Sequence, residues 1–138
     1  MEDRQLYVLS GVIVSNISFI LAAIGLIALT NRIFKRTELT FWTGILFSLN
    51  PASVFMSAVY TESTYTMLAI WGMYFYTLSA DYFGNTKTPA LFGLLSAVLF
   101  ALATATRGNG IILCGFFVYH FMRSFREGSI IPRVSNFV

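Results

Sequence analysis

The sequence predicts an all-α, polytopic membrane protein, because of its composition, the spacing of its charges and the length of its uncharged runs. Of its 138 residues, 57% are hydrophobic and 11% are charged, and the mean hydropathy is +0.72. Soluble domains carry about 25% charged residues, so this composition excludes an ordinary water-soluble protein. We therefore expect a single membrane-embedded helical region over residues 1–138.

Five long uncharged runs predict the individual membrane segments. They are residues 5–31, 39–61, 63–80, 88–106 and 108–122. A helix needs about 20 predominantly apolar residues to cross the hydrocarbon core, and short hydrophobic turns can be re-entrant, so four or five membrane segments are expected. The first run is longer than the core of a signal peptide and follows the acidic Glu2 and Asp3, which predicts a retained membrane helix.

The second run contains the dipeptide Asn50-Pro51, which predicts a broken helix. Pro51 has no N–H to donate to the carbonyl of Phe47, and it disfavours helical geometry at Asn50. A helix that begins at Leu39 should end or kink there, after about 16 Å at a rise of about 1.5 Å per residue. That length is roughly half of the hydrocarbon thickness, so the number of complete spans stays at four or five.

Lysine and arginine are distributed unevenly between the runs. The segment 31–38 carries three, the segment 81–87 one and the C-terminal segment three, whereas the other side carries Arg4 and Arg107. The positive-inside rule makes the first group cytoplasmic and the N-terminus lumenal or exterior, with Glu62 and Arg107 on that same side. The net charge of +3 is thus explained by topology, and no basic stripe indicates nucleic acid.

A four-residue repeat of small residues in the fourth run predicts a face for close helix packing. The repeat consists of Gly93, Ala97, Ala101 and Ala105. Small side chains let helix backbones approach closely in a membrane, so this face is expected to pack against protein.

Glu62 and Arg107 interrupt otherwise apolar sequence, and two interpretations of them stay open. In the first, each lies in a solvated turn or the two form a structural ion pair. In the second, Arg107 and the backbone N–H groups of Gly108 and Gly110 hold a phosphate, while Glu62 positions the arginine or a sugar hydroxyl. Hydroxyl groups near Glu62 would then line a polar site; they belong to Tyr60, Thr61, Ser63, Thr64 and Tyr65.

Two motifs carry a resemblance to a known family. The stretch NPASVF at 50–55 is followed by SAVYTES at 57–63, and ATRGNG occupies 105–110. In order and spacing, these motifs resemble those of the PIG-V family, the second mannosyltransferase of glycosylphosphatidylinositol (GPI) anchor assembly. The resemblance covers the chain from roughly the first run onward.

The resemblance implies a partial helical bundle of the glycosyltransferase C superfamily in the endoplasmic-reticulum membrane. It implies a mannosyl (hexosyl) transferase that moves mannose from dolichol-phosphate-mannose to a GPI intermediate on the lumenal face. Whether an accessory membrane subunit is a further partner stays open. Substrate-binding roles then fall to Asn50, Glu62, Arg107, Asn109 and Gly110. No metal constellation or cofactor loop is found in the sequence, and none is expected.

The sequence departs from the family pattern in one respect. The family is expected to take its catalytic carboxylate from an acidic motif in a large lumenal loop before the matched region, and Glu2 and Asp3 do not reproduce that motif. The catalytic residue is therefore unassigned, and the chain resembles a fragment of a longer enzyme. A non-catalytic membrane binding or assembly subunit is the alternative from another class, and a transporter, suggested by the broken helix, is a weaker one.

Overall fold

The computed structural model describes the backbone of residues 2–50, 61–81 and 88–126, and every element in these ranges is a helix. The elements are α1 (Glu2–Phe34), α2 (Thr37–Leu49), α4 (Glu62–Asp81), α5 (Thr88–Thr106), the 3-10 helix η1 (Gly108–Leu113) and α6 (Cys114–Arg126). The all-α prediction is confirmed for these ranges. Pro51 and the segment 82–87 lie outside the described residues, so the shape of the predicted break beyond Asn50 is not described.

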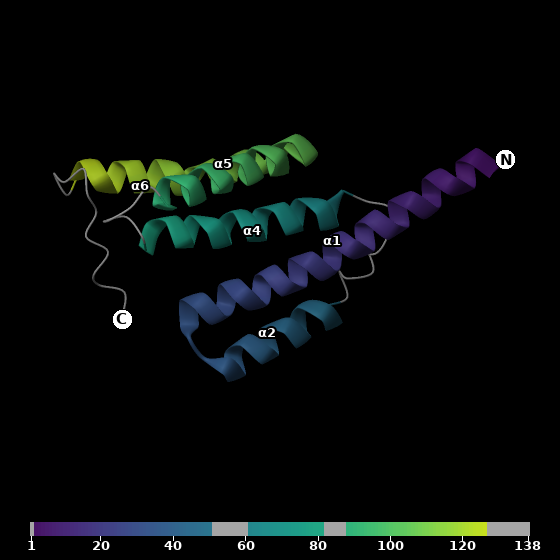
Figure 1. The fold of residues 1–138 in the computed structure, drawn as a ribbon, viewed down its shortest axis with the longest axis horizontal. Helices are drawn as coiled ribbons and strands as arrows, with labels where there is room; N and C mark the ends of the chain where they lie inside the picture. Colours follow the sequence, from purple (N-terminus) through teal and green to yellow (C-terminus); the bar gives the residue numbers. More distant parts are fainter. Residues whose placement is uncertain (1, 51–60, 82–87, 127–138) are drawn as a thin grey trace.

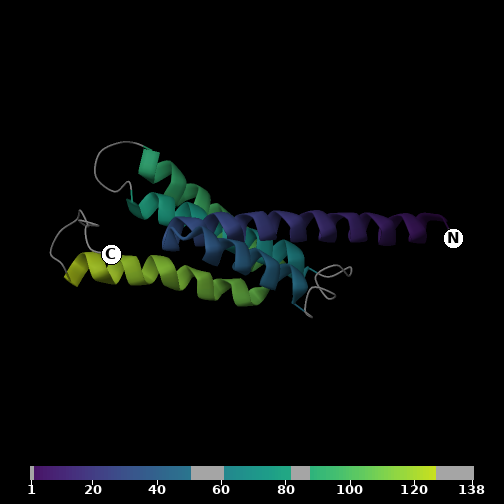
Figure 2. The same ribbon diagram turned by 90° about the horizontal axis from the view of Figure 1, so that it is seen from below.

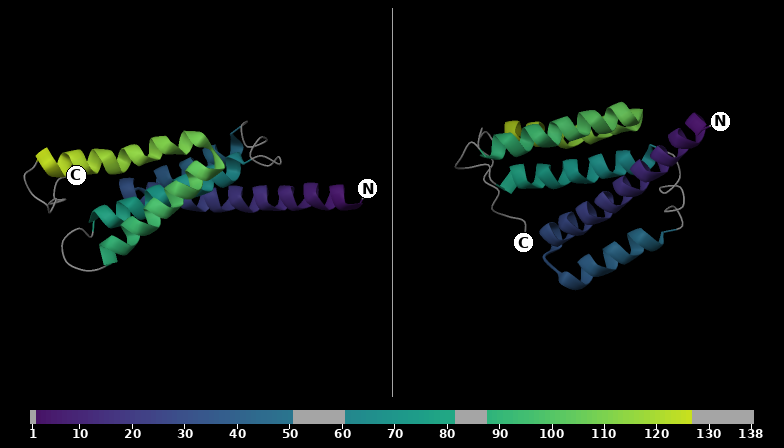
Figure 3. Two further views of the ribbon diagram at one scale, coloured as in Figure 1. Left: turned by 90° about the horizontal axis from the view of Figure 1, so that it is seen from above. Right: turned by 45° about the vertical axis from the view of Figure 1, so that its right-hand side comes forward.

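α4 is the central helix of the bundle (Figure 1). α1 and α5 pack on either side of it, and α2 packs against α1, which gives the order α2, α1, α4, α5 in the right-hand view of Figure 3. η1 packs on α5, and α6 then runs back in the opposite direction to α5 (Figure 2). Aromatic rings of α6 contact Tyr76 of α4 and Phe100 of α5. Because successive helices alternate in direction, the ends of α2 and α5 lie at the same end of the bundle as the start of α4.

Small and hydroxyl-bearing residues form the face of α1 that packs on its neighbours. The buried positions are Ser15, Ser18, Ala22, Gly25, Leu29 and Thr30, of which the first five are spaced alternately by three and four. Ser15 Oγ donates to Ser63 Oγ over 3.3 Å, and the hydroxyls of Ser18 and Thr64 are 3.4 Å apart. Small side chains and interhelical hydrogen bonds hold helices together where the surroundings are as apolar as the core.

Trp71 forms the clearest single link between α1 and α4. Its indole Nε1 donates to the backbone carbonyl of Leu21 over 3.1 Å. A Cβ atom on Gly25 would lie 3.0 Å from the same Nε1, so the glycine makes room for the ring. The link therefore depends on the indole N–H of Trp71 in α4 and on the glycine at position 25 of α1, which has no side chain to exclude the ring.

We expect Trp71→Phe to lower the free energy of unfolding by about 1 kcal/mol, the usual net value of one intramolecular hydrogen bond. Trp42→Phe is the matched control, because Trp42 is 59% exposed on α2. Denaturant titration of both variants in detergent micelles, followed by far-UV circular dichroism, measures the difference. Equal midpoints for the two variants would show that the indole bond contributes nothing.

The contact between α4 and α5 is the most extensive one among the described helices. Ser96 Oγ donates to the Gly72 carbonyl over 2.8 Å, and the ring of Phe100, which is 1% exposed, lies over Gly72. Ala103 is fully buried on the same face of α5. Leu68, Ala69 and Leu113 complete the buried apolar cluster.

The prediction that Gly93, Ala97, Ala101 and Ala105 form the packed face of α5 is wrong for the chain as described. Ala97, Ala101 and Ala105 are exposed, and only Gly93, which lies against Ser79, is partly buried. Each helical residue turns by about 100°, so three steps of four residues rotate about 120° away from the starting face. The buried residues of α5 are instead spaced alternately by three and four, so they all face α4.

Membrane spanning is supported most directly for α1. Of the helices within the described ranges, one segment, Gln5–Phe34, is long and apolar enough to cross a membrane, and the apolar segments Ala90–Thr106 and Gly108–Met122 are shorter. The prediction of four or five spans therefore stays a prediction. Because Ser15 lies level with Ser63, the second residue of α4, the first turns of α1 extend beyond the rest of the bundle (Figures 1 and 2).

Candidate functional site

The alternating helix directions bring the predicted site residues to one end of the bundle. Glu62 is the first residue of α4, and Arg107 lies between the end of α5 and the start of η1. Asn50 caps α2 at this same end. A direct contact between Glu62 and Arg107 confirms that the two lie at one end of the bundle, whereas their side of the membrane stays a prediction.

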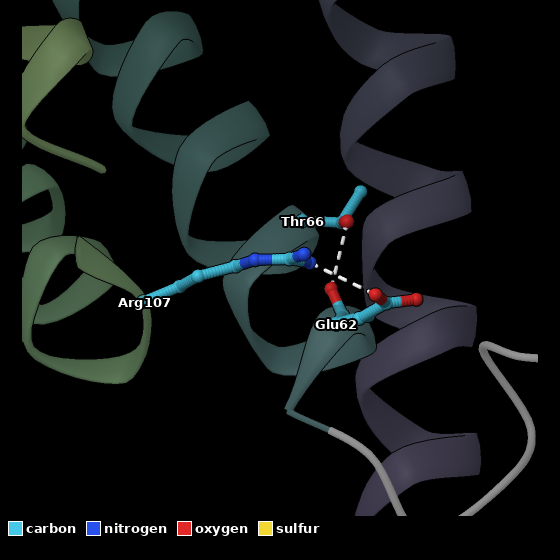
Figure 4. A network of polar contacts seen from close by, with 3 residues as sticks. All are labelled: Glu62, Thr66 and Arg107. Atoms are coloured by element: carbon cyan, nitrogen blue, oxygen red, sulfur yellow. Dashed lines mark hydrogen bonds and ion pairs between the residues drawn. The ribbon is translucent and has the colours of Figure 1, made fainter. Parts of the chain in front are cut away.

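Arg107 and Glu62 form an ion pair that joins α4 to the α5–η1 junction (Figure 4). Arg107 Nη1 donates to Glu62 Oε1 over 2.9 Å, and the two side chains are 45% and 40% exposed. Ion pairs this exposed contribute about 0–1 kcal/mol to stability, so the pair matters little for holding the helices together. Its main consequence is geometric, because it holds the guanidinium above the start of α4.

The backbone around each partner explains why the two side chains meet. Arg107 adopts extended geometry, with φ −152° and ψ 125°, which separates α5 from η1 and directs its side chain toward α4. Its N–H donates to the Ala103 carbonyl over 3.0 Å, so its own position is fixed by α5. Glu62 is fixed by the first turn of α4, where Thr66 Oγ1 donates to the Glu62 carbonyl over 2.8 Å. The positive end of the helix dipole also stabilises a carboxylate at this position.

Gly110 has a different environment from the one that the anion-site interpretation assumes. It is buried, and its N–H donates to the Arg107 carbonyl over 2.8 Å, so this N–H is engaged within the chain. A Cβ atom on Gly110 would lie 2.6 Å from Thr104 Cα and from Thr104 N. Gly110 therefore lets η1 pack directly on the backbone of α5. Gly108 and Asn109 are exposed beside Arg107.

Asn50 ends α2 with φ −60° and ψ 131°, and the helix stops at Leu49. The predicted end of the helix before Pro51 is thus confirmed. Asn50 caps α2, which packs against α1. The ion pair instead joins α4 to the end of α5, through Arg107. The structure brings Glu62 and Arg107 into contact and places Asn50 at the same end of the bundle.

The hydroxyl groups near Glu62 that lie within the described residues do not form one polar lining. Ser63 and Thr64 bond to α1, as described above, and Tyr65 packs against the apolar cluster. Thr61 is exposed next to Glu62, and Tyr60 lies outside the described residues. Thr66, one turn after Glu62, was not predicted as part of the site. The signal for it is that a threonine in a helix can donate to the backbone carbonyl four residues earlier, which here is that of Glu62.

Comparison with known proteins places this chain in a family. A family model described as Mannosyltransferase (PIG-V) matches residues 2–136. GPI mannosyltransferase 2 of Schizosaccharomyces pombe is 33% identical over 97 residues, which cover 70% of this chain and 18% of that protein. GPI alpha-1,6-mannosyltransferase 2 of Rattus norvegicus is 28% identical over 131 residues, which cover 95% of this chain and 24% of that protein.

A third relative, GPI mannosyltransferase 2 of Aspergillus oryzae, is 31% identical over 132 residues, which cover 90% of this chain and 30% of that protein. The chain thus spans less than a third of the length of these relatives. No solved structure matches it. Because the family model covers nearly the whole sequence, the resemblance seen in the two motifs is confirmed, and the chain belongs to the PIG-V mannosyltransferase family.

Proposed function

We propose that this chain is part of a mannosyltransferase that adds the second mannose to a GPI precursor, using dolichol-phosphate-mannose as the donor. The observation that carries the proposal is the half-exposed guanidinium of Arg107, held by Glu62 at one end of the bundle. The reaction class comes from the names of the relatives. The proposed location is the endoplasmic-reticulum membrane, with this end of the bundle lumenal and the segment 31–38 cytoplasmic.

The chemistry explains what a fixed arginine contributes. In the transfer, the bond between mannose C1 and the phosphate oxygen of the donor breaks, and C1 forms a bond with the acceptor hydroxyl oxygen. The electron pair of the broken bond stays on the dolichyl phosphate, and the hydroxyl proton passes to a base. A guanidinium stabilises the departing phosphate with paired N–H donors, which is a geometry that lysine does not offer.

The remaining site residues have supporting roles in this proposal. Glu62 holds Arg107 in place before the donor binds, and Asn109 offers an exposed amide beside it. Gly110 allows η1 to lie close enough to α5 for the junction to form. Asn50 contributes from the end of α2, at the rim of the same end of the bundle.

Arg107→Ala tests the proposal in a full-length family member, at the arginine of the corresponding motif. We expect a rise of about tenfold to a hundredfold in the KM for dolichol-phosphate-mannose, because a hydrogen bond to a charged group contributes about 1.5–3 kcal/mol. Transfer of radiolabelled mannose in isolated membranes, at several donor concentrations, gives KM and kcat separately. Arg107→Lys should restore part of the loss.

Arg126→Ala is the control, because it removes the same group from the far end of α6. Unchanged donor KM in Arg107→Ala would contradict the assigned phosphate contact.

Expression of the 138-residue chain alone in cells that lack the second GPI mannosyltransferase separates an enzyme from a binding subunit. Restored surface GPI-anchored protein would place the catalytic groups within this chain and would make Glu62 the candidate base.

A further inference from the structure

The turn between α1 and α2 presents two exposed cations at the end of the bundle opposite the ion pair (Figures 1 and 3). Lys35 has a φ of 52°, and its N–H closes α1 by donating to the Asn31 carbonyl over 2.9 Å. Arg36 follows in extended geometry and is the N-cap of α2. Within the described ranges, the exposed Lys35, Arg36 and nearby Glu38 form no side-chain ion pair with one another. The two cations are therefore available to an external anion.

An exposed apolar surface begins next to these cations. α2 packs on α1 through the buried Thr40, through Gly44, which lies against Ile27, and through Phe47, whose ring stacks on Phe19. The opposite side of α2 stays open. Its exposed residues, with exposed fractions of 59% to 75%, are Phe41, Trp42, Leu46 and Leu49.

We propose that the α1–α2 turn and the open side of α2 bind an anionic phospholipid. The lipid phosphate would contact Lys35 and Arg36, and its acyl chain would lie along Trp42 and Leu46. Cations followed by an aromatic residue are the pattern of a membrane–water interface. An acidic protein segment would satisfy the cations but would leave the aliphatic residues of α2 uncovered, whereas a phospholipid matches both parts. The proposal requires membrane insertion of α1 and is independent of mannosyl transfer.

Trp42 is a built-in reporter for this site. The chain is reconstituted into phosphatidylcholine vesicles in which about one lipid in five is either brominated phosphatidylserine or brominated phosphatidylcholine. Subtracting the signal of Trp42→Phe isolates the quenching of Trp42 from that of Trp71. We expect the relative association constant of the anionic lipid over phosphatidylcholine at Trp42 to be at least about five, because one cation near the surface contributes about a factor of five, or about 1 kcal/mol.

Lys35→Gln/Arg36→Gln should abolish the enrichment. The matched control, Lys87→Gln/Arg123→Gln, removes two positive charges elsewhere and should keep it. Salt near 1 M, which shortens the Debye length to about 3 Å, should also reduce the enrichment in the unmodified chain. Equal quenching by both lipids, or a preference that survives loss of the two cations, overturns the proposal.

If the double glutamine variant fails to insert, Lys35→Arg/Arg36→Lys and the salt titration decide the outcome. A preference that persists in the charge-conserving variant and falls with salt supports the lipid site. A preference that ignores salt overturns it. Mannosyl transfer is not part of the readout, so a failure here leaves the test of Arg107 unaffected.

Discussion

Replacing Gly110 with alanine is expected to lower the free energy of unfolding by about 3 kcal/mol or more, at the upper end of overpacking effects. The new methyl group would lie 2.6 Å from Thr104 Cα and Thr104 N, and 2.9 Å from Ala103 C. These are backbone atoms of a helix, so no side-chain rotation can relieve the clash. η1 must instead move away from α5, which would disturb the Gly110 N–H bond to Arg107 and the position of the arginine.

Gly108→Ala is the matched control two residues away. A Cβ atom at Gly108 meets nothing within 4 Å, so we expect stability to stay unchanged or to rise by up to about 1 kcal/mol. Denaturant titration in detergent micelles measures both variants. If Gly110→Ala and Gly108→Ala gave the same midpoint, the close contact of η1 with α5 would not exist in solution.

Gly72→Ala is expected to lower the free energy of unfolding by about 3 kcal/mol for a related reason. Here the added methyl group clashes with a side chain and not with backbone atoms. The added Cβ atom would lie less than 3.0 Å from two atoms of the Phe100 ring. Phe100 is 1% exposed and packs against the rings of Phe116 and Phe117, so it cannot move away without displacing its neighbours. We therefore expect α4 and α5 to separate and the Ser96 bond to the Gly72 carbonyl to weaken.

A double-mutant cycle with Phe100→Leu tests the cause of this loss. The smaller side chain leaves room for the alanine methyl group. The loss of stability in the double variant should therefore be smaller than the sum of the two single losses by about 1 kcal/mol or more. Gly115→Ala is the control, because a Cβ atom there meets nothing within 4 Å. Strict additivity of Gly72→Ala and Phe100→Leu would show that the ring and the glycine are not in contact.

The ends of the helices could be predicted because the charged residues mark them. α4 begins at Glu62, and the α5–η1 junction lies at Arg107, both at the ends of uncharged runs. The end of α2 at Leu49 follows from the proline two residues later. Alternating directions of successive helices then place Glu62 and Arg107 at one end of the bundle, although 45 positions separate them in the chain.

Rotations of helices about their own axes could not be predicted in the same way. A repeat of four and an alternation of three and four both produce stripes of small residues, and only the position of a neighbour decides which stripe is buried. The same uncertainty affected Ser63, which looked like part of a polar lining and instead bonds to Ser15 on α1. The role of Gly110 depends on how closely η1 approaches α5, which residue type alone does not indicate.

The long helix α1 also measures depth along the bundle. Ser15, level with the start of α4, and Phe34, at the basic turn, are separated by a rise of about 28 Å at about 1.5 Å per residue. This rise is close to the thickness of the hydrocarbon core, about 30 Å. In the proposed topology, which puts the basic turn in one headgroup layer, Glu62 and Arg107 would lie in the other. The proposed lipid-linked donor would then present its phosphate to Arg107 while its tail stays in the bilayer.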